Sequence, residues 1–198
     1  FLATVIANQF FPSSSVSLGL LKTFGVFAVA FAMRPLGGLF FGMLGDKLGR
    51  KSILSLTILL MAGATTLIGL VPSHASIGIL APVLLTVLRC LQGFSAGGEY
   101  AGSVAYVMEH APNDQRGWYG SFIPVSTFSA FASAALLVFA LEFSLAPDAM
   151  AAWGWRIPFL VAAPLGFIGL YLRWRLEETP AFMALSSETK PKTHSTLA

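Results

Sequence analysis

The sequence has 198 residues, of which 56% are hydrophobic and only 11% are charged, and its mean hydropathy is +0.75. A soluble domain carries about 25% charged residues because its surface faces water, so this composition excludes an ordinary soluble domain and indicates a membrane protein. The net charge of +3 comes from 12 basic residues that form no basic stripe, which argues against nucleic acid as a partner. The single cysteine, Cys90, excludes an internal disulfide framework and a cysteine-based zinc site.

A helix needs about 20 apolar residues to cross the hydrocarbon layer of a bilayer. The opening stretch, 1–11, is apolar but too short, so we interpret it as the outer end of a truncated first helix. A signal peptide is the competing interpretation, but the stretch has no basic start and no small-residue cleavage site. Five full membrane-spanning segments are predicted at about 18–44, 53–71, 79–107, 119–143 and 156–174.

The basic residues predict the orientation, because lysine and arginine are retained on the cytoplasmic side of a membrane. Two lie at helix ends on the opposite side, Lys22 and Arg156, against eight in the loops after the second, fourth and sixth segments and in the tail. The eight are Lys47, Arg50, Lys51, Arg116, Arg173, Arg175, Lys190 and Lys192. We therefore expect a multi-pass protein of the plasma (inner) membrane, with a transmembrane bundle at 1–183 and the start of a central cytoplasmic linker at 184–198.

Three ionisable residues fall well inside the predicted spans: Arg34, Arg89 and Glu99. Each is costly in hydrocarbon, so each is expected to face a partner or a water-filled cavity. Arg34 lies 12 residues before Asp46, roughly 18 Å along its helix. Glu99 lies 10 residues before Glu109, roughly 15 Å along its own. These matching depths predict an Arg34–Glu99 ion pair, either as a structural lock or as part of a mechanism.

Arg89 is the remaining charge, because it lies about 15 Å along the helix from Glu99 and the two cannot touch. No acid of matching depth is visible, which favours a functional role, although a partner in the missing part of the first helix is the alternative. Gln92, one turn further on, offers both donors and acceptors to a substrate or to water. We predict that Arg34, Arg89, Gln92 and Glu99 serve proton coupling and the substrate path.

Glycines at a spacing of four residues lie on the second and fourth segments. Such pairs let helix backbones approach closely, and they also let helices slide or bend. We interpret most of them as packing positions. The pairs are Gly38 with Gly42, Gly93 with Gly97, and Gly98 with Gly102.

The stretch 42–51 (GMLGDKLGRK) compresses an acid and three bases between glycines at a predicted cytoplasmic helix boundary. A tight turn needs the glycines, and the charges can bridge neighbouring helix ends. This stretch resembles the signature of the major facilitator superfamily between helices two and three. The stretch 89–93 (RCLQG) resembles the fourth-helix motif of the same superfamily, whose arginine is implicated in proton coupling.

Narrower motifs resemble the metabolite:proton symporter family within that superfamily. They are RPLGG at 34–38, QGFSAGGEY at 92–100, GWRIPF at 154–159 and LEETPAF at 176–182. The stretches 34–47 and 164–182 are most similar to proline/betaine transporters. Shikimate, 2-oxoglutarate and citrate carriers share most of these motifs, so an organic-acid:proton symporter remains the alternative.

The resemblance implies an all-α integral membrane protein, the N-terminal six-helix half of a twelve-helix major facilitator fold, with the first helix truncated. It implies alternating access coupled to proton entry, with Arg89 holding or modulating a proton-carrying acid and Glu99 as the obvious acid. The expected partners are a small-molecule substrate, protons, the lipid bilayer and the missing C-terminal half. A latch on the cytoplasmic face is expected from Gly42, Gly45, Asp46, Gly49, Arg50, Lys51 and Arg116, with cytoplasmic retention and helix-end capping as the alternative interpretation.

The predicted fifth helix departs from the family, which usually has glycines there. No glycine occurs between Gly120 and Gly154, and hydroxyl residues occur instead: Ser121, Ser126, Thr127, Ser129 and Ser133. They either line a cavity or bond back to their own helix, which is the commoner arrangement.

An enzyme is disfavoured, because Glu99 is the only deeply placed acid and the histidines, His74, His110 and His194, fall in loops or the tail. We expect no cofactor and no metal. A non-transporting, degenerate half-protein is a further alternative.

Overall fold

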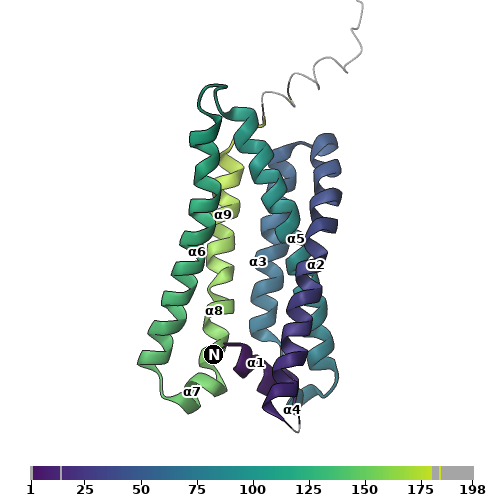
Figure 1. The fold of residues 1–198 in the computed structure, drawn as a ribbon, viewed down its shortest axis with the longest axis vertical. Coiled ribbons are helices and arrows are strands. Elements are labelled where there is room, and N and C mark those ends of the chain that lie inside the picture. Colours follow the sequence, from purple (N-terminus) through teal and green to yellow (C-terminus); the bar gives the residue numbers. More distant parts are fainter. Residues whose placement is uncertain (1, 14, 180–182, 184–198) are drawn as a thin grey trace, which may run out of the picture.

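The computed structural model describes residues 2–13, 15–179 and 183, and within these ranges the chain is helical without a strand (Figure 1). The predicted linker at 184–198 lies outside the described residues, with Lys190, Lys192 and His194, as do Phe1 and residues 180–182 of the LEETPAF motif. The long helices are α2 (Val16–Leu48), α3 (Arg50–Leu70), α5 (Leu80–His110), α6 (Arg116–Ser144) and α9 (Ala162–Arg175). The short ones are α1 (Leu2–Phe10), α4 (His74–Ile77), α7 (Pro147–Ala152), the 3-10 turn η1 (Gly154–Arg156) and α8 (Ile157–Leu160).

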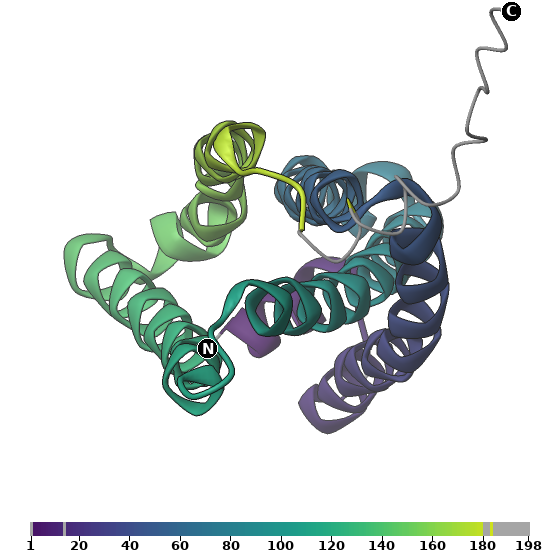
Figure 2. The ribbon, with the colours of Figure 1, turned by 90° about the horizontal axis from the view of Figure 1, so that it is seen from above.

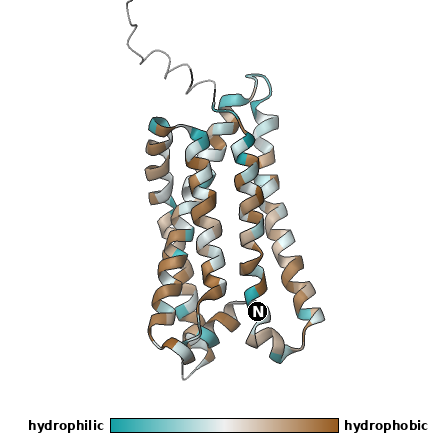
Figure 3. Cartoon of the chain, turned by 180° about the vertical axis from the view of Figure 1, so that it is seen from behind, coloured by the Kyte–Doolittle hydropathy of each residue, from teal (hydrophilic) through white to brown (hydrophobic). Residues whose placement is uncertain are grey.

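In the part of the chain that the structure describes, five helical stretches are long and apolar enough to cross a membrane: α2, α3, α5, α6 and the run Gly154–Arg175. In each of them, at most 33% of the residues in the most apolar 18-residue stretch are buried, and no residue of α6 is buried. Apolar residues therefore cover much of the outside of the bundle between its two ends (Figure 3). Such a surface suits a hydrocarbon surrounding or further protein, and not water.

The connection between α2 and α3 is a single residue, Gly49, which differs from the longer glycine-rich turn expected at 42–51. Gly49 has φ 93° and ψ 146°, a backbone conformation that glycine adopts without the steric penalty of a side chain. Its N–H donates to the carbonyl of Gly45 at 3.1 Å and closes the last turn of α2. Gly42 and Gly45 are helical, because the polar residues beyond the apolar run continue the helix of α2.

The last predicted span, 156–174, is not one continuous helix. It is divided into η1, α8 and α9, with Val161 between the two α-helices. Pro158 lies at the start of α8, and Pro164 has no N–H to donate to the carbonyl of Leu160. The two prolines explain why the helical hydrogen bonding is interrupted here.

The two ends of the bundle differ in character (Figure 1). One end of the bundle is formed by the end of α2, the start of α3, the end of α5, the start of α6 and the end of α9. We call it the basic end, because the predicted cytoplasmic Lys and Arg residues of the described chain belong to these helix ends. The opposite end holds a cluster of buried apolar residues, in which Phe10 and Phe159 pack edge-on against Trp155 at centroid distances of 5.8 and 6.0 Å. There Arg156 donates to the carbonyls of Gly69 and Val71 and satisfies the C-terminus of α3.

α5 lies between α2 and α3, α9 packs beside α3, and α6 lies at the edge (Figure 2). The α2–α5 contact is so close that a Cβ atom at Gly93 or Gly97 would come within 1.9 Å of the carbonyl oxygens of Ala30 and Arg34, respectively. A Cβ at Gly37 would meet the carbonyl of Phe94 at the same distance. The three glycines thus form a backbone-to-backbone seam. Gly37 was not among the predicted packing positions.

The other predicted packing glycines lie outside this seam, and only Gly98 and Gly102 among them are tightly packed, at 2.3 and 2.9 Å from the nearest side-chain atom to a Cβ built there. A Cβ at Gly38 would lie 3.6 Å from the carbonyl of Gly97, an ordinary contact. Gly98 and Gly102 face side chains, the ring of Phe41 and the methyl group of Leu54. Around Gly42 nothing lies within 4 Å. The Gly38/Gly42 spacing therefore does not mark the seam, which lies one residue earlier on α2.

We predict that Gly97→Ala lowers the unfolding temperature of the purified protein, because the added methyl group forces α2 and α5 apart. Gly42→Ala is the matched control and should leave that temperature unchanged or raise it, since alanine favours a helix over glycine by about 1 kcal/mol. Thermal unfolding of both variants in the same detergent checks this. Equal effects of the two substitutions would contradict the seam.

Candidate functional site

A chain of polar side chains joins α5 to α3 in the middle of the bundle. Arg89 Nη1 donates to Gln92 Oε1 at 2.9 Å, and Gln92 Nε2 donates to Thr65 Oγ1 at 2.6 Å. Thr65 Oγ1 in turn donates to the carbonyl of Met61 at 2.7 Å. Arg89 and Gln92 share one face of α5 because they are three residues apart. The sequence predicts the first two members, but not Thr65.

The rest of the Arg89 guanidinium lies against aromatic rings. Its carbon is 4.6 Å from the ring centroid of Phe27 on α2 and 5.5 Å from that of Phe159 on α8. Such cation–π contacts favour a cation that has been removed from water. Within the described residues Arg89 has no ion pair with an acid.

Glu99 forms an ion pair with Arg173 on α9, with 2.6 Å between Oε1 and Nη2. The side chains of Glu99 and Arg173 are only 21% and 15% exposed. Arg173 Nη1 also donates to the carbonyl of Leu54 on α3, at 2.5 Å, so one guanidinium ties three helices together. Glu99 Oε2 is buried and has no hydrogen-bond partner within the part of the chain that the structure describes.

The predicted Arg34–Glu99 ion pair is therefore wrong. The matching depths were a valid observation, but they say nothing about the direction in which each side chain points. The seam fixes Gly97 against α2, and Glu99, two residues on, is rotated by about 200° around α5 and points towards α9. Its partner, Arg173, had been placed among the cytoplasmic basic residues.

Arg34 lies on the exposed side of α2. Its carbonyl oxygen is in the seam, and its guanidinium lies over the ring of Phe31 at 4.5 Å from the centroid. Arg34 itself is exposed and forms no ion pair with any described residue. The structure thus separates Arg34 from the Arg89–Gln92–Thr65 chain and from Glu99.

At the basic end, Arg50 connects α2, α3 and α5. Its Nη2 is 2.8 Å from Asp46, one turn back, and its Nε is 3.3 Å from Glu109. Arg116, which the expected latch includes, is exposed and forms no ion pair with a described residue, whereas Glu109, which it does not include, pairs with Arg50. Asp46 is 65% exposed, and its pair with Arg50 is therefore the weaker of the two in water.

The residues after α9 return to the start of α3. Glu178 Oε1 accepts the backbone N–H of Lys51 at 3.2 Å, which replaces the missing side-chain cap of Gly49. Lys51 Nζ donates to the carbonyl of Trp174 at 3.1 Å, and Tyr106 donates to the carbonyl of Glu177 at 3.0 Å. The helix-end capping expected for this motif is thus present at α3.

The hydroxyl residues of α6 bond to their own helix. Ser126 and Thr127 donate to the carbonyl of Ile123 at 2.8 and 3.0 Å. Ser121 donates to the carbonyl of Trp118 at 2.7 Å, and Ser133 to that of Ser129 at 2.8 Å. Bonding back to the helix is therefore the interpretation that the structure supports for these four residues.

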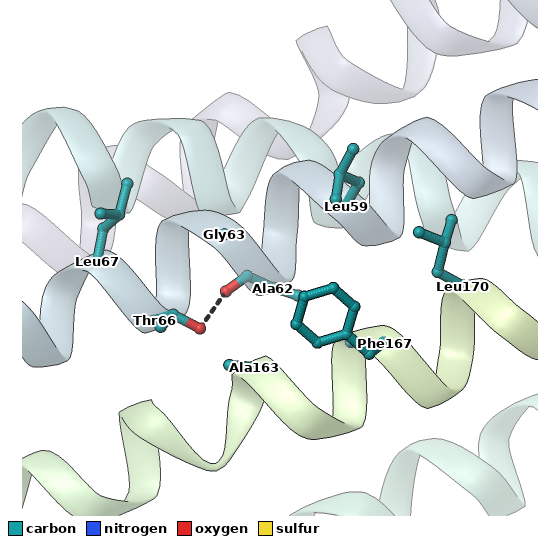
Figure 4. A pocket seen from close by; sticks show the side chains of 9 residues that line it. Leu59, Ala62, Gly63, Thr66, Leu67, Ala163, Phe167 and Leu170 are labelled. Atoms are coloured by element: carbon teal, nitrogen blue, oxygen red, sulfur yellow. Dashed lines mark hydrogen bonds between the residues drawn. The ribbon is translucent and has the colours of Figure 1, made fainter.

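Other parts of the described chain offer little polar chemistry. A groove of about 290 Å³ between α3 and α9 is lined by Leu59, Ala62, Gly63, Thr66, Leu67, Ala163, Gly166, Phe167 and Leu170 (Figure 4). Its one hydroxyl, on Thr66, donates to the carbonyl of Ala62 at 2.8 Å. Within the described ranges, no three His, Cys, Asp or Glu residues come together to hold a metal ion.

Residues 2–198 match the family described as "Sugar (and other) transporter". The chain is 48% identical over 182 residues to a proline/betaine transporter of Salmonella typhimurium, covering 92% of this chain and 36% of that protein. It is 47% identical over 182 residues to the proline/betaine transporter of Escherichia coli K12, with the same coverage. The chain thus spans 36% of the length of these relatives.

Solved structures share the arrangement of helices. The xylose transporter XylE from Escherichia coli, in a partially occluded inward-open conformation, aligns with a TM-score of 0.80 at 17% identity, over 94% of this chain and 46% of that one. The major facilitator superfamily proton:xylose symporter XylE bound to 6-bromo-6-deoxy-D-glucose aligns with a TM-score of 0.82 at 17% identity, over 95% and 44%. At this identity the likeness concerns the fold alone.

We predict that Glu99 and Arg173 are energetically coupled. Glu99→Gln and Arg173→Gln should each lower the unfolding temperature, because each leaves a half-buried charge without its partner. The double variant should be no less stable than the worse single variant. Arg34→Gln combined with Glu99→Gln is the control, and its effects should add. Unfolding of the three single and two double variants measures both cycles. Coupling of Glu99 to Arg34 in place of Arg173 would contradict the Glu99–Arg173 ion pair.

We also predict that Glu178→Ala loosens the first turn of α3, because it removes the carboxylate that accepts the N–H of Lys51. Losing a helix N-cap costs about 1 kcal/mol. Hydrogen exchange at 50–53 should become faster. Glu177→Ala is the control and should leave exchange there unchanged, since Glu177 contributes only its backbone carbonyl. Equal protection in both variants would show that Glu178 does not cap α3.

Proposed function

We propose that the full-length protein is a proton-coupled symporter. The premise is that the chain belongs to the family of sugar and other transporters and has the fold of the N-terminal half of a major facilitator transporter. This family confirms the resemblance drawn from the motifs at 42–51 and 89–93. The chain is a multi-pass segment of an inner-membrane protein, with five helices able to cross the membrane. The solute that we favour is a small osmolyte of the proline or glycine betaine kind, because relatives 47% and 48% identical to this chain are named proline/betaine transporters.

The observation that carries the proposal is Arg89. It lies in α5, nine residues after Leu80, and within the described residues its charge is balanced by no acid. A membrane-embedded cation held only by an amide and two rings is costly as a structural element, since an ion pair or an apolar residue would hold helices together at lower cost. Such a residue is suited to attract a carboxylate, either of the solute or of a proton-carrying acid.

The role of Glu99 in proton coupling now competes with a structural role. Its Oε1 is committed to Arg173, and this ion pair holds α9 on α5 and α3. Its Oε2 is buried without a described partner and is the one oxygen left for a proton or a water molecule. We infer that Glu99 is part of the coupling machinery only through that second oxygen.

We infer that a second half of the transporter covers part of the exposed surface of this chain. Every residue of α6 is left unburied, and Arg34 presents a charge at mid-span on the outer side of α2. A guanidinium facing lipid chains is unfavourable, so we infer that Arg34 faces the other half or the cavity between the halves. Alternating access would then move this half against the other, with the Asp46–Arg50–Glu109 cluster opening and closing at the basic end.

The test is uptake of labelled proline and glycine betaine by the full-length protein, in cells that lack their own carriers, with and without an uncoupler. Arg89→Gln should reduce uncoupler-sensitive uptake roughly 10-fold or more, as expected when a hydrogen-bonded charge is lost. Arg175→Gln is the control, because Arg175 is exposed and bonds only within α9. The amount of protein in the membrane is measured for each variant.

Shikimate and 2-oxoglutarate are tested alongside. Uptake of an organic acid alone would keep the symporter and overturn the osmolyte proposal. Uptake that ignores the uncoupler would overturn proton coupling. No uptake from well-inserted protein would favour the non-transporting alternative.

A further inference from the structure

Thr65 is the end of the polar chain that begins at Arg89, and the chain has a fixed direction. A threonine hydroxyl has one hydrogen to donate, and that of Thr65 is used by the carbonyl of Met61 at 2.7 Å. Thr65 is therefore an acceptor towards Gln92, at 2.6 Å. The amide of Gln92 must present its NH₂ group to α3.

The consequence for Arg89 follows from the chemistry of an amide. When the NH₂ group of Gln92 faces Thr65, its oxygen is left facing Arg89, which has only donors. A Gln92 amide turned the other way would set two donors against each other at Arg89 and lose the bond to Thr65. The guanidinium on one side and the hydroxyl on α3 on the other thus hold the Gln92 amide in a single orientation.

The guanidinium of Arg89 depends on this orientation of the Gln92 amide, because its other contacts do not fix the direction in which its N–H groups point. The rings of Phe27 and Phe159 hold its face at 4.6 and 5.5 Å, but a ring face tolerates rotation of the cation above it. The bond to Gln92 is the one directional contact that Arg89 makes with the described residues. It determines where the remaining N–H groups of Arg89 point.

We propose that Thr65 is a positioning residue for Arg89: through Gln92 it fixes the orientation in which the Arg89 guanidinium meets a carboxylate during transport. This inference rests on the proposed function. It adds a residue of α3, outside the predicted site, to the machinery of proton coupling and solute uptake.

The neighbouring residue, Thr66, provides a matched comparison. It is also half-buried and also donates to the carbonyl four residues back, Ala62, at 2.8 Å. It lies in the apolar groove towards α9 and has no bond to α5 (Figure 4). The two threonines differ in one respect, the bond that Thr65 accepts from Gln92.

The experiment compares Thr65→Val, Thr65→Ser and Thr66→Val in the full-length protein, at equal amounts in the membrane. Thr65→Val should lower uptake about 5- to 10-fold, since it leaves the NH₂ group of Gln92 without an acceptor. It should also shift the pH at which uptake is half-maximal. Thr65→Ser should restore both values, and Thr66→Val should match the unaltered protein. Loss in both Thr65 variants, or in neither, would overturn the proposal.

Gln92→Ala tests whether the effect passes through the amide. Thr65→Val should have no further effect on uptake or its pH profile once Gln92 is alanine, because the chain is already broken. Additive effects of the two substitutions would overturn the proposal and assign Thr65 a packing role.

A readout that needs no transport separates this proposal from the proposed function. Phenylglyoxal modifies arginine, and its rate at Arg89 can be followed by mass spectrometry of the peptide. Thr65→Val should speed this modification by releasing the guanidinium, whereas Thr66→Val should not. An unchanged rate in Thr65→Val overturns the positioning role. A faster rate in a protein that takes up no solute supports positioning and overturns the symporter alone.

Discussion

The direct contact between the backbones of α2 and α5 is the constraint on which the rest of this bundle depends. At Gly37, Gly93 and Gly97 there is no room for a side chain, so the two helices meet in one rotational setting. Because a helix turns by about 100° per residue, this setting decides where every other side chain of α5 points. Gln92 and Glu99 are directed to α3 and α9, and Arg89 stays beside α2, where Phe27 covers it.

The three charges inside the spans are held in three different ways. Glu99 is neutralised by Arg173, which makes that ion pair a connection between helices. Arg89 keeps its charge among two rings and one amide, an arrangement with less electrostatic compensation. Arg34 is left exposed on α2. The electrostatic compensation of the charge thus decreases from Glu99 through Arg89 to Arg34. Arg89 and Arg34 are therefore the residues that a contact with a solute or with another part of the protein would stabilise most.

Hydropathy was sufficient to predict the membrane-spanning helices, because burial in lipid leaves its mark on residue type, and the resemblance of the motifs indicated the family. They were not sufficient to predict which side chains meet. Depth along a helix can be counted from the sequence, but rotation about the axis depends on the seam, and an error of one residue, Gly38 for Gly37, turns the face by about 100°. The ion pair of Arg173 was not predicted, since a basic residue at a helix end is equally typical of cytoplasmic retention.

Thr65 could not have been found from the sequence. A threonine in a helix normally bonds to its own backbone, as Thr65 and Thr66 both do, and nothing in the letters distinguishes them. The expected turn at 42–51 was wrong in a related way. The glycines there suggested a loop, whereas the charged residues between them continue the helix until Gly49.

Gly49, the single residue between α2 and α3, constrains how this half can move. One residue spans at most about 3.6 Å, so α2 has almost no slack with which to slide along α3. The space inside the joint is filled by Arg50, whose side chain lies against Gly45 and Asp46. The angle between the two helices can therefore change, but the helices cannot slide along each other. Arg173 attaches α9 to α3 through the carbonyl of Leu54. Within this half, α6 is the helix that can shift most easily, because it is joined by longer connections and holds no buried residue.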